Sequence, residues 1–467
     1  MRKASLFVLI LLCTFLIIAK IRHLSLPFFW DEAWPYSTGA FYMYSNGLSL
    51  LPGAVPFDIS RGHPLFFHFL AAVWMKAFGT SLLSIHLFPL LISLLLILCT
   101  YFFCLDFFSE NVALVSSILI MVQPVFLSQS AMLLPEVLVA LLTLLSLWAF
   151  LREKKRFYIL CAVMLLLTKE SGIIIVVSLF CSDIFENIYQ KKERRILVII
   201  SDSFYLLIPF AIASGFFILQ KIKTGYFFLP MYVDEENLKW ALFSEKLKNY
   251  FAYVFIYQGR NALSIFLVLA VAILIIQKIT IPPESKRVIL PMMVFVILYF
   301  LFSSFSFYSP RYMLSVIPLV IIMATYMVFV AADKKQIIYI GFLLVTSVVS
   351  VSYCLRKKPV NDHSPGFADG IVVTQSAVNY CEEKEMYGKK IYTNFLMQMH
   401  LTHPEHGYLA VGKGFDVTAD FDPAVNVYIA LSYEPDDLYD VLKQRGGFRL
   451  IKRFEKNYAW SEIYERK

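Results

Sequence analysis

The chain has 467 residues, of which 59% are hydrophobic and 16% charged, a composition that excludes an ordinary soluble globular protein. The formal net charge of +8 would suit nucleic-acid binding, but residues 356–467 hold 15 Lys and Arg against 16 Asp and Glu, so the basic excess lies in the apolar part. Basic residues there orient membrane helices, and we expect a membrane protein with no nucleic acid as a partner.

Eleven apolar segments approach the length of about 20 residues that a helix needs to cross a bilayer. They lie at residues 5–21, 83–103, 112–128, 133–151, 157–168, 171–187, 196–219, 261–277, 288–304, 311–331 and 337–355. We expect the first to be an uncleaved helix, with a cleaved signal peptide as the alternative. The sequence therefore predicts an α-helical polytopic membrane protein with about eleven transmembrane helices.

Short basic clusters predict the orientation, because cytoplasmic loops are rich in Lys and Arg. The clusters are residues 2–3, 152–156, 191–195, 278 with 286–287, and 334–335. Eleven crossings put all five on one side, provided that the aromatic segment 65–78 does not cross. We therefore expect residues 65–78 to form an interfacial helix.

Two segments should then lie outside the membrane. The first outer loop covers residues 22–82, and a second outer element covers residues 220–260, with Tyr226, Pro230, Tyr232 and Arg260. The outer side is expected to be extracytoplasmic, and the short loops favour a bacterial inner membrane. Residues 1–355 would form the membrane domain.

The composition changes at Arg356, and residues 356–467 alternate strand-like and helical patterns. Strands are expected at residues 390–393, 425–431, 448–454 and 460–464, and helices at residues 374–387 and 436–444. Such alternation predicts a small soluble α/β domain, extracytoplasmic by the same parity. It contains no Gly-rich phosphate loop, so we expect no nucleotide cofactor.

Carboxylates in the outer region are the first candidates for chemistry. Asp31 and Glu32 are adjacent on a loop and point in different directions, so one can act as a general base while the other orients a partner; the alternative is a solvated helix cap. Glu136 begins the fourth span inside apolar sequence, where an acid usually faces a partner; the alternative is a plain helix-start acid. Asp31 and Glu136 could share Mg²⁺ or Mn²⁺.

Basic side chains on the same side are candidates for a phosphate or an acceptor. His63, in Arg61-Gly-His-Pro64, could touch either, or simply belong to a helix start. Lys169 interrupts the fifth and sixth spans and could bind a phosphate as a point charge, or lie in a solvated turn. Arg311 begins the tenth span and is a phosphate candidate, with interfacial snorkelling as the alternative. Arg260 is a weaker candidate of the same type.

The ordered motifs resemble the glycosyltransferase C superfamily, in the branch of protein O-mannosyltransferases and lipid A aminoarabinose transferases (families 39 and 83). The motifs are Phe-Trp-Asp31-Glu32-Ala, His63-Pro-Leu-Phe-Phe, Ala77-Phe-Gly79, Ser130-Ala-Met-Leu-Leu-Pro-Glu136, Leu167-Thr-Lys169 and Arg311-Tyr-Met-Leu-Ser-Val-Ile-Pro318. The tail resembles the outer domain of bacterial relatives in Gly388–Thr393 and Ala459–Tyr464, and without a Trp-Trp-Asp motif the oligosaccharyltransferase branch is disfavoured.

The resemblance implies a hexosyl- or pentosyltransferase that passes a sugar from a polyprenyl-phosphate donor to a lipid, glycan or protein acceptor outside the membrane, with inversion. It implies that Asp31 is the base, with Glu32 beside it, and that Glu136 and His63 meet the acceptor or a metal. Lys169 and Arg311 match positions that would hold the donor phosphate, and Arg260 and Tyr312 are further candidates for the same phosphate.

Two other classes of function stay open on the sequence. A transporter or lipid flippase would need polar groups along a path through the membrane, and the spans carry few of them. A noncatalytic relative would bind a polyprenyl lipid and present its tail to other envelope proteins.

Overall fold

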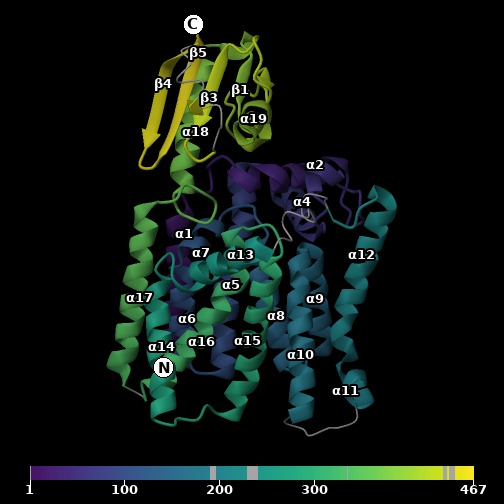
Figure 1. The fold of residues 1–467 in the computed structure, drawn as a ribbon, viewed down its shortest axis with the longest axis vertical. Helices are drawn as coiled ribbons and strands as arrows, with labels where there is room; N and C mark the ends of the chain where they lie inside the picture. Colours follow the sequence, from purple (N-terminus) through teal and green to yellow (C-terminus); the bar gives the residue numbers. More distant parts are fainter. Residues whose placement is uncertain (1, 190–195, 229–239, 334, 435–438, 441–446) are drawn as a thin grey trace.

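The computed structural model describes residues 2–189, 196–228, 240–333, 335–434, 439–440 and 447–467. It has a bundle of helices with a small α/β layer at one end, and the N-terminus lies toward the other end (Figure 1). The bundle contains α1 (Arg2–Lys20), α5 (Leu82–Phe107), α6 (Glu110–Met121), α7 (Pro124–Gln129), α8 (Glu136–Leu151), α9 (Lys155–Thr168), α10 (Ile173–Tyr189), α11 (Ile196–Ser203), α12 (Ile208–Thr224), α13 (Trp240–Phe255), α14 (Arg260–Ile276), α15 (Pro283–Ser304), α16 (Ile317–Ala331) and α17 (Gln336–Arg356).

Local sequence explains where several of these helices begin and end. Ser81 and Ser109 accept hydrogen bonds from the backbone amides three residues ahead, at the starts of α5 and α6. Gly79, at φ 85°, ends the helix before α5 in a conformation that other residues rarely adopt. Short polar caps of this kind allow long apolar helices to reverse direction at the ends of the bundle.

Each of the eleven predicted segments falls on one or more of these helices, so the polytopic helical fold is confirmed. Within the described residues, five stretches are long and apolar enough to cross a membrane by themselves: Leu82–Phe107, Glu170–Ile188, Ile200–Thr224, Pro283–Ser304 and Gln336–Arg356. Leu242–Phe255 and Arg260–Ile276 form a pair bent by 85° that would count as a sixth. The number eleven therefore stays a prediction, whereas the integral membrane character is clear.

Loops with predicted basic clusters meet at the end of the bundle away from the α/β layer. Arg287, at the start of α15, pairs at 3.0 Å with Glu153 after α8 and at 3.0 Å with Glu186 on α10. These contacts agree with the prediction that the basic clusters at 152–156 and 286–287 lie on one side of the membrane. The cluster at 191–195 and Lys334 lie outside the described residues.

The first outer loop forms a platform at the opposite end. It contains the short helical turns η1 (Trp30–Glu32) and η2 (Ala33–Ser37), followed by α2 (Thr38–Asn46), α3 (Phe57–Ser60) and α4 (Phe66–Phe78). The predicted helix at 65–78 is thus present, and α2 and α4 lie between the bundle and the α/β layer (Figure 1). In the second outer element, α13 was not predicted, and Pro230 and Tyr232 lie outside the described residues.

The C-terminal α/β layer follows α17. It contains α18 (Phe367–Glu383), β1 (Ile391–Thr393), α19 (Phe395–Thr402), β2 (Val417–Thr418), β3 (Val427–Leu431), β4 (Phe448–Lys456) and β5 (Ala459–Arg466). The strand order is β2-β1-β3-β5-β4, parallel from β2 to β3 and antiparallel at β3/β5 and β5/β4. Four predicted strands are confirmed; α18 begins earlier than predicted, β2 and α19 were missed, and most of the predicted helix at 436–444 lies outside the described residues.

The α/β layer packs directly on the first outer loop. The Phe28 amide donates to the His406 carbonyl at 3.0 Å, and the Phe29 and Tyr433 rings lie 5.3 Å apart. Among the described residues, the largest cluster of buried apolar side chains runs from the bundle into the layer. The division of the chain at residue 356 falls at the end of α17 and stays a prediction as a domain boundary.

Candidate active site

Two adjoining cavities lie where the bundle meets the first outer loop. The larger, of about 460 Å³, has walls that are mostly aliphatic and aromatic, from α9, α10, α12, α15 and the segments beside them. The smaller, of about 30 Å³, is lined by Asp31, Pro35, Tyr36, Arg61, His63, Phe307, Arg311 and Tyr312. Arg61, His63, Phe307 and Tyr312 line both, so a molecule in the large cavity would extend toward Asp31.

Arg311 organises the small cavity from the turn that precedes α16. Its Nη2 donates to Asp31, its Nε donates to Glu136 at 3.1 Å, and its Nη1 donates to Asp362. The guanidinium is buried, and three nitrogen atoms each meet a different carboxylate. A planar fork bound in this way holds three separate segments of chain in fixed directions.

Lys169 joins this network from the turn between α9 and α10. Its Nζ lies 3.0 Å from Glu136 Oε1 and 3.5 Å from the centre of the Tyr312 ring, which it faces as a cation over an aromatic face. Glu136 is the first residue of α8, where the helix dipole favours a carboxylate. Glu136 therefore bridges Lys169 and Arg311, and its second carboxylate oxygen is buried without a hydrogen bond within the described residues.

Asp31 and Glu32 point in different directions, as the sequence predicted. Asp31 keeps 25% side-chain exposure and lines the small cavity. Glu32 is buried, accepts hydrogen bonds from the amides of Leu133 (2.6 Å) and Phe29 (3.1 Å), and lies 2.9 Å from His86 Nε2. It lines neither cavity, so this position suits support of the Asp31 loop rather than the predicted catalytic role.

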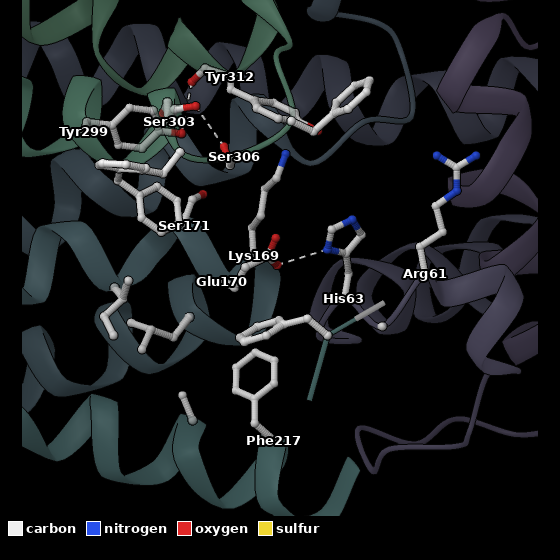
Figure 2. A pocket seen from close by; sticks show the side chains of 18 of the residues that line it. Arg61, His63, Lys169, Glu170, Ser171, Phe217, Tyr299, Ser303, Ser306 and Tyr312 are labelled. Carbon is white, nitrogen blue, oxygen red and sulfur yellow. Dashed lines mark hydrogen bonds and ion pairs between the residues drawn. The ribbon is translucent and has the colours of Figure 1, made fainter. Parts of the chain in front are cut away.

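Arg61, His63 and Lys169 all line the large cavity (Figure 2). His63 Nδ1 lies 3.0 Å from Glu170 Oε2, which fixes the imidazole at the rim. Arg61 has a positive φ of 51° beside Gly62, and this turn directs the segment toward α4. Within the described part of the chain the Arg61 guanidinium forms no hydrogen bond or ion pair, so its charge is available to an anion.

Arg260 does not reach this site, and its predicted contact with a donor phosphate has no support in the geometry. The guanidinium is fully buried at the bend between α13 and α14. It donates to the Tyr253 carbonyl at 2.8 Å and to the Gln123 and Gln258 side chains at 3.2 and 3.4 Å. Arg260 therefore fixes the bend.

The arrangement does not fit the predicted divalent cation. The space between Asp31 and Glu136 is occupied by the Arg311 guanidinium, which binds both carboxylates. Among the described residues, no group of three or more His, Cys, Asp or Glu is placed to hold a metal ion.

Two residues of the site, Asp362 and Arg61, were not among the site residues predicted from the sequence. Asp362, after α17, is buried and bound to Arg311; burial alone would raise the pKa of its carboxyl, but Arg311 and His363 hold that pKa well below its usual range. Asp362 lies after the change of composition at Arg356, in a part of the chain that the sequence assigns to a separate soluble domain. The sequence motif at Arg61 is also that of a helix start, but an Arg two residues before His63 is a signal for a second cation at the same site.

Comparisons with known proteins identify the fold. Residues 62–213, about one third of the chain, match the family described as dolichyl-phosphate-mannose-protein mannosyltransferase. The chain superposes on the crystal structure of apo ArnT from Cupriavidus metallidurans with a TM-score of 0.59, at 12% identity and with 98% of each chain covered. A sequence search of curated proteins finds no significant match.

The chain has the glycosyltransferase C fold. ArnT from the same organism bound to undecaprenyl phosphate gives a TM-score of 0.56 at 13% identity, with 97% of each chain covered. The archaeal oligosaccharyltransferase AglB from Archaeoglobus fulgidus, in complex with an inhibitory peptide and a dolichol-phosphate, gives 0.50 at 12% identity, over 99% of this chain and 74% of AglB. The fold that the motif resemblance implies is thus confirmed.

Proposed function

We propose that the protein is a membrane glycosyltransferase that transfers a sugar from a polyprenyl-phosphate-linked donor to an acceptor hydroxyl on the extracytoplasmic side. The observation that carries this proposal is the junction of the two cavities. A carboxylate, Asp31, lines a small polar cavity that adjoins a large apolar cavity with cations at its rim.

The large cavity suits a lipid phosphate. Its aromatic and aliphatic walls match a polyprenyl chain, and burial of such a chain is favourable at about 25 cal/mol per Å² of apolar surface. At the rim, Arg61 has no anionic partner within the described residues, and Lys169 shares one carboxylate with Arg311. Arg61 and Lys169 are therefore the residues that we assign to the phosphate, with Tyr312 beside them. ArnT and AglB solved with polyprenyl phosphates support this class of donor.

Asp31 is the proposed general base. The acceptor O–H gives its proton to Asp31 while the acceptor oxygen attacks the anomeric carbon. The bond from that carbon to the phosphate oxygen breaks, and the lipid phosphate leaves with the electron pair, stabilised by Arg61 and Lys169. One displacement inverts the anomeric centre, and Asp31 is the sole carboxylate among the described residues that line the small cavity.

The expected side follows from charge. The described basic loops around Glu153 and Arg287 lie at the end of the bundle away from α2, α4 and the α/β layer, and such loops are retained in the cytoplasm. The site and the α/β layer would then face outward in a bacterial inner membrane. The acceptor would be a lipid, glycan or protein hydroxyl, and the donor sugar a hexose or pentose.

A donor screen tests the proposal. Purified protein is given a panel of polyprenyl-phosphate sugars and a membrane extract as acceptor, and release of polyprenyl phosphate is measured for the unmutated protein, Asp31→Asn and Asp58→Asn. Asp58 is an exposed acid in the same loop that lines neither cavity, and so is a matched control.

Release that needs Asp31 but not Asp58 supports the transferase, and NMR of the product tests inversion. If the unmutated protein binds the lipid but releases no polyprenyl phosphate, the noncatalytic relative is favoured. If it moves lipid across vesicle membranes but releases no polyprenyl phosphate, the flippase is favoured.

A further inference from the structure

The segment between α17 and α18 reaches into the site. Asp362, in this segment, is 5% exposed, and its carboxylate accepts a hydrogen bond from Arg311 Nη1. Asp362 lines neither cavity, so it would not touch a bound substrate. Its partner Arg311 does line the small cavity, and Arg311 in turn binds Asp31.

We infer that Asp362 is a positioning residue for the transfer, which holds the Arg311 guanidinium and through it the Asp31 carboxylate, so that the segment leading to the α/β layer helps to build the active site. This inference rests on the proposed function.

The geometry of Arg311 carries the inference. Glu136 binds at Nε, Asp31 at Nη2 and Asp362 at Nη1, so the three carboxylates surround the edge of one planar group. With all three in place the guanidinium cannot rotate without breaking an ion pair. Without Asp362, Nη1 loses its carboxylate partner, and the guanidinium is held only through Nε and Nη2. A small displacement of a catalytic group costs large factors in rate, because the reacting atoms must be aligned.

The segment that carries Asp362 is itself fixed in place. Gln129 Nε2 donates to the Asp362 carbonyl at 2.6 Å, and Gln258 Nε2 donates to the His363 carbonyl at 3.0 Å. The Tyr253 ring packs edge-on against His363 at 5.7 Å. Arg260 binds both Tyr253 and Gln258, so its place at the bend of α13 and α14 contributes to holding this segment.

Local charge supports the same role. Asp31, Glu136 and Asp362 carry three negative charges around the two positive charges of Arg311 and Lys169. The lowered pKa of Asp362 keeps its carboxyl ionised at working pH. Loss of the Asp362 carboxylate removes the charged hydrogen-bond acceptor of the buried Nη1 atom, and a buried donor that loses its acceptor is costly to the arrangement around it. Asp362 therefore acts on the site through Arg311.

Asp369 gives a matched control. It is as deeply buried as Asp362 and also lies beyond α17, but it pairs with Asn457 at 2.7 Å, Lys357 at 3.5 Å and Lys456 at 3.8 Å, away from Arg311. Asp362→Asn is expected to lower kcat about 30-fold with donor KM changed less than about threefold, and Asp362→Glu to restore part of kcat. Asp369→Asn should lower Tm while kcat stays within about threefold.

A readout without turnover separates this inference from the proposed function. Asp31→Asn and Asp362→Asn should be non-additive in Tm, because both act on one guanidinium, whereas Asp31→Asn and Asp369→Asn should add. The inference is overturned by additive shifts for the first pair, by kcat of Asp362→Asn within about threefold of the unmutated protein, or by an equal kcat loss in Asp369→Asn. If the unmutated protein releases no polyprenyl phosphate, the proposed function fails, and the Tm cycle still decides the coupling.

Discussion

Arg311 binds the carboxylate of Asp31 across 280 positions of sequence, and joins the turn before α16 to the first outer loop. The ion pair aims the proposed base at the small cavity while leaving a quarter of the Asp31 side chain exposed. Because Glu136 and Asp362 bind the same guanidinium, the direction of Asp31 depends on segments from three parts of the chain.

Arg311→Lys should retain the charge but lose the fork. A lysine ammonium is a point charge and cannot meet three carboxylates in one plane, so we expect kcat to fall about 100-fold, equivalent to about 2.7 kcal/mol. Steady-state kinetics of donor consumption checks this. Arg152→Lys, in the ion pair with Asp106 at the far end of the bundle, should leave kcat unchanged. Equal activity of Arg311→Lys and the unmutated protein would show that the fork is unnecessary.

Arg61→Gln should weaken donor binding without unfolding the protein. Arg61 has no ion pair within the described residues, so its removal strands no buried partner. We expect donor KM to rise about tenfold and Tm to change by less than about 2 °C. Titration of the donor against the variant measures the first, and a thermal melt the second. An unchanged KM would remove Arg61 from the phosphate site.

Substitution of Glu32 should mainly lower stability, whereas substitution of Asp31 should mainly lower kcat. Glu32→Gln breaks the buried pair with His86, which we expect to cost about 3 kcal/mol of stability, while the molecules that remain folded keep most of their kcat. Asp31→Asn should show the reverse order, with a smaller loss of Tm than Glu32→Gln and a large loss of kcat. Thermal melts and kinetics on the same preparations test the pair. A kcat loss in folded Glu32→Gln as large as that of Asp31→Asn would restore the predicted catalytic role of Glu32.

Stability of the α/β layer should fall in acid. Burial lowers the pKa of His406 to about 3 and the pKa of His400 well below its ordinary value, so both are neutral in the folded layer. The unfolded chain takes up protons below about pH 6.5, so this stability is full above that pH and is lost as pH falls toward 3. For His406, about 2 kcal/mol should be lost between pH 7.5 and pH 5.

The contribution of His400 can be isolated. Its two ring nitrogens have no hydrogen-bond partner within the described residues, and its ring lies 4.0 Å from that of Tyr408. His400→Phe keeps an aromatic ring there and should reduce the Tm difference between pH 7.5 and pH 5. A variant with the full pH dependence would contradict this assignment.

Chelation should leave transfer intact. Arg311 occupies the space between Asp31 and Glu136 that the predicted cation would need. We expect activity in excess EDTA to lie within about twofold of activity in Mg²⁺ or Mn²⁺. A loss that either metal restores would support the metal prediction made from the sequence.

The sequence could predict which residues gather, and less well what each one does. Parity of the crossings brought Asp31, Glu136, Lys169 and Arg311 to one end, and the structure has them in one network. Arg260 shares that end, but the 85° bend between α13 and α14 turns it into a buried structural position that a linear pattern does not reveal.

Asp362 was out of reach for a different reason. It lies in a hydrophilic segment beyond α17, where composition predicts a separate layer, and its contact with Arg311 is made only by the return of that segment to the bundle. Strands of the layer were predictable because their apolar residues cluster, whereas β2 is two residues long and carries no pattern.

The central claim is that Asp31 removes the proton from the acceptor. The most direct measurement is the single-turnover rate of sugar transfer from saturating donor in Asp31→Asn and in the unmutated protein, with the donor Kd measured on the same preparations. We expect donor Kd to change less than about threefold and the rate to fall about 1,000-fold. A rate within about tenfold of the unmutated protein, at equal donor binding, would contradict the account.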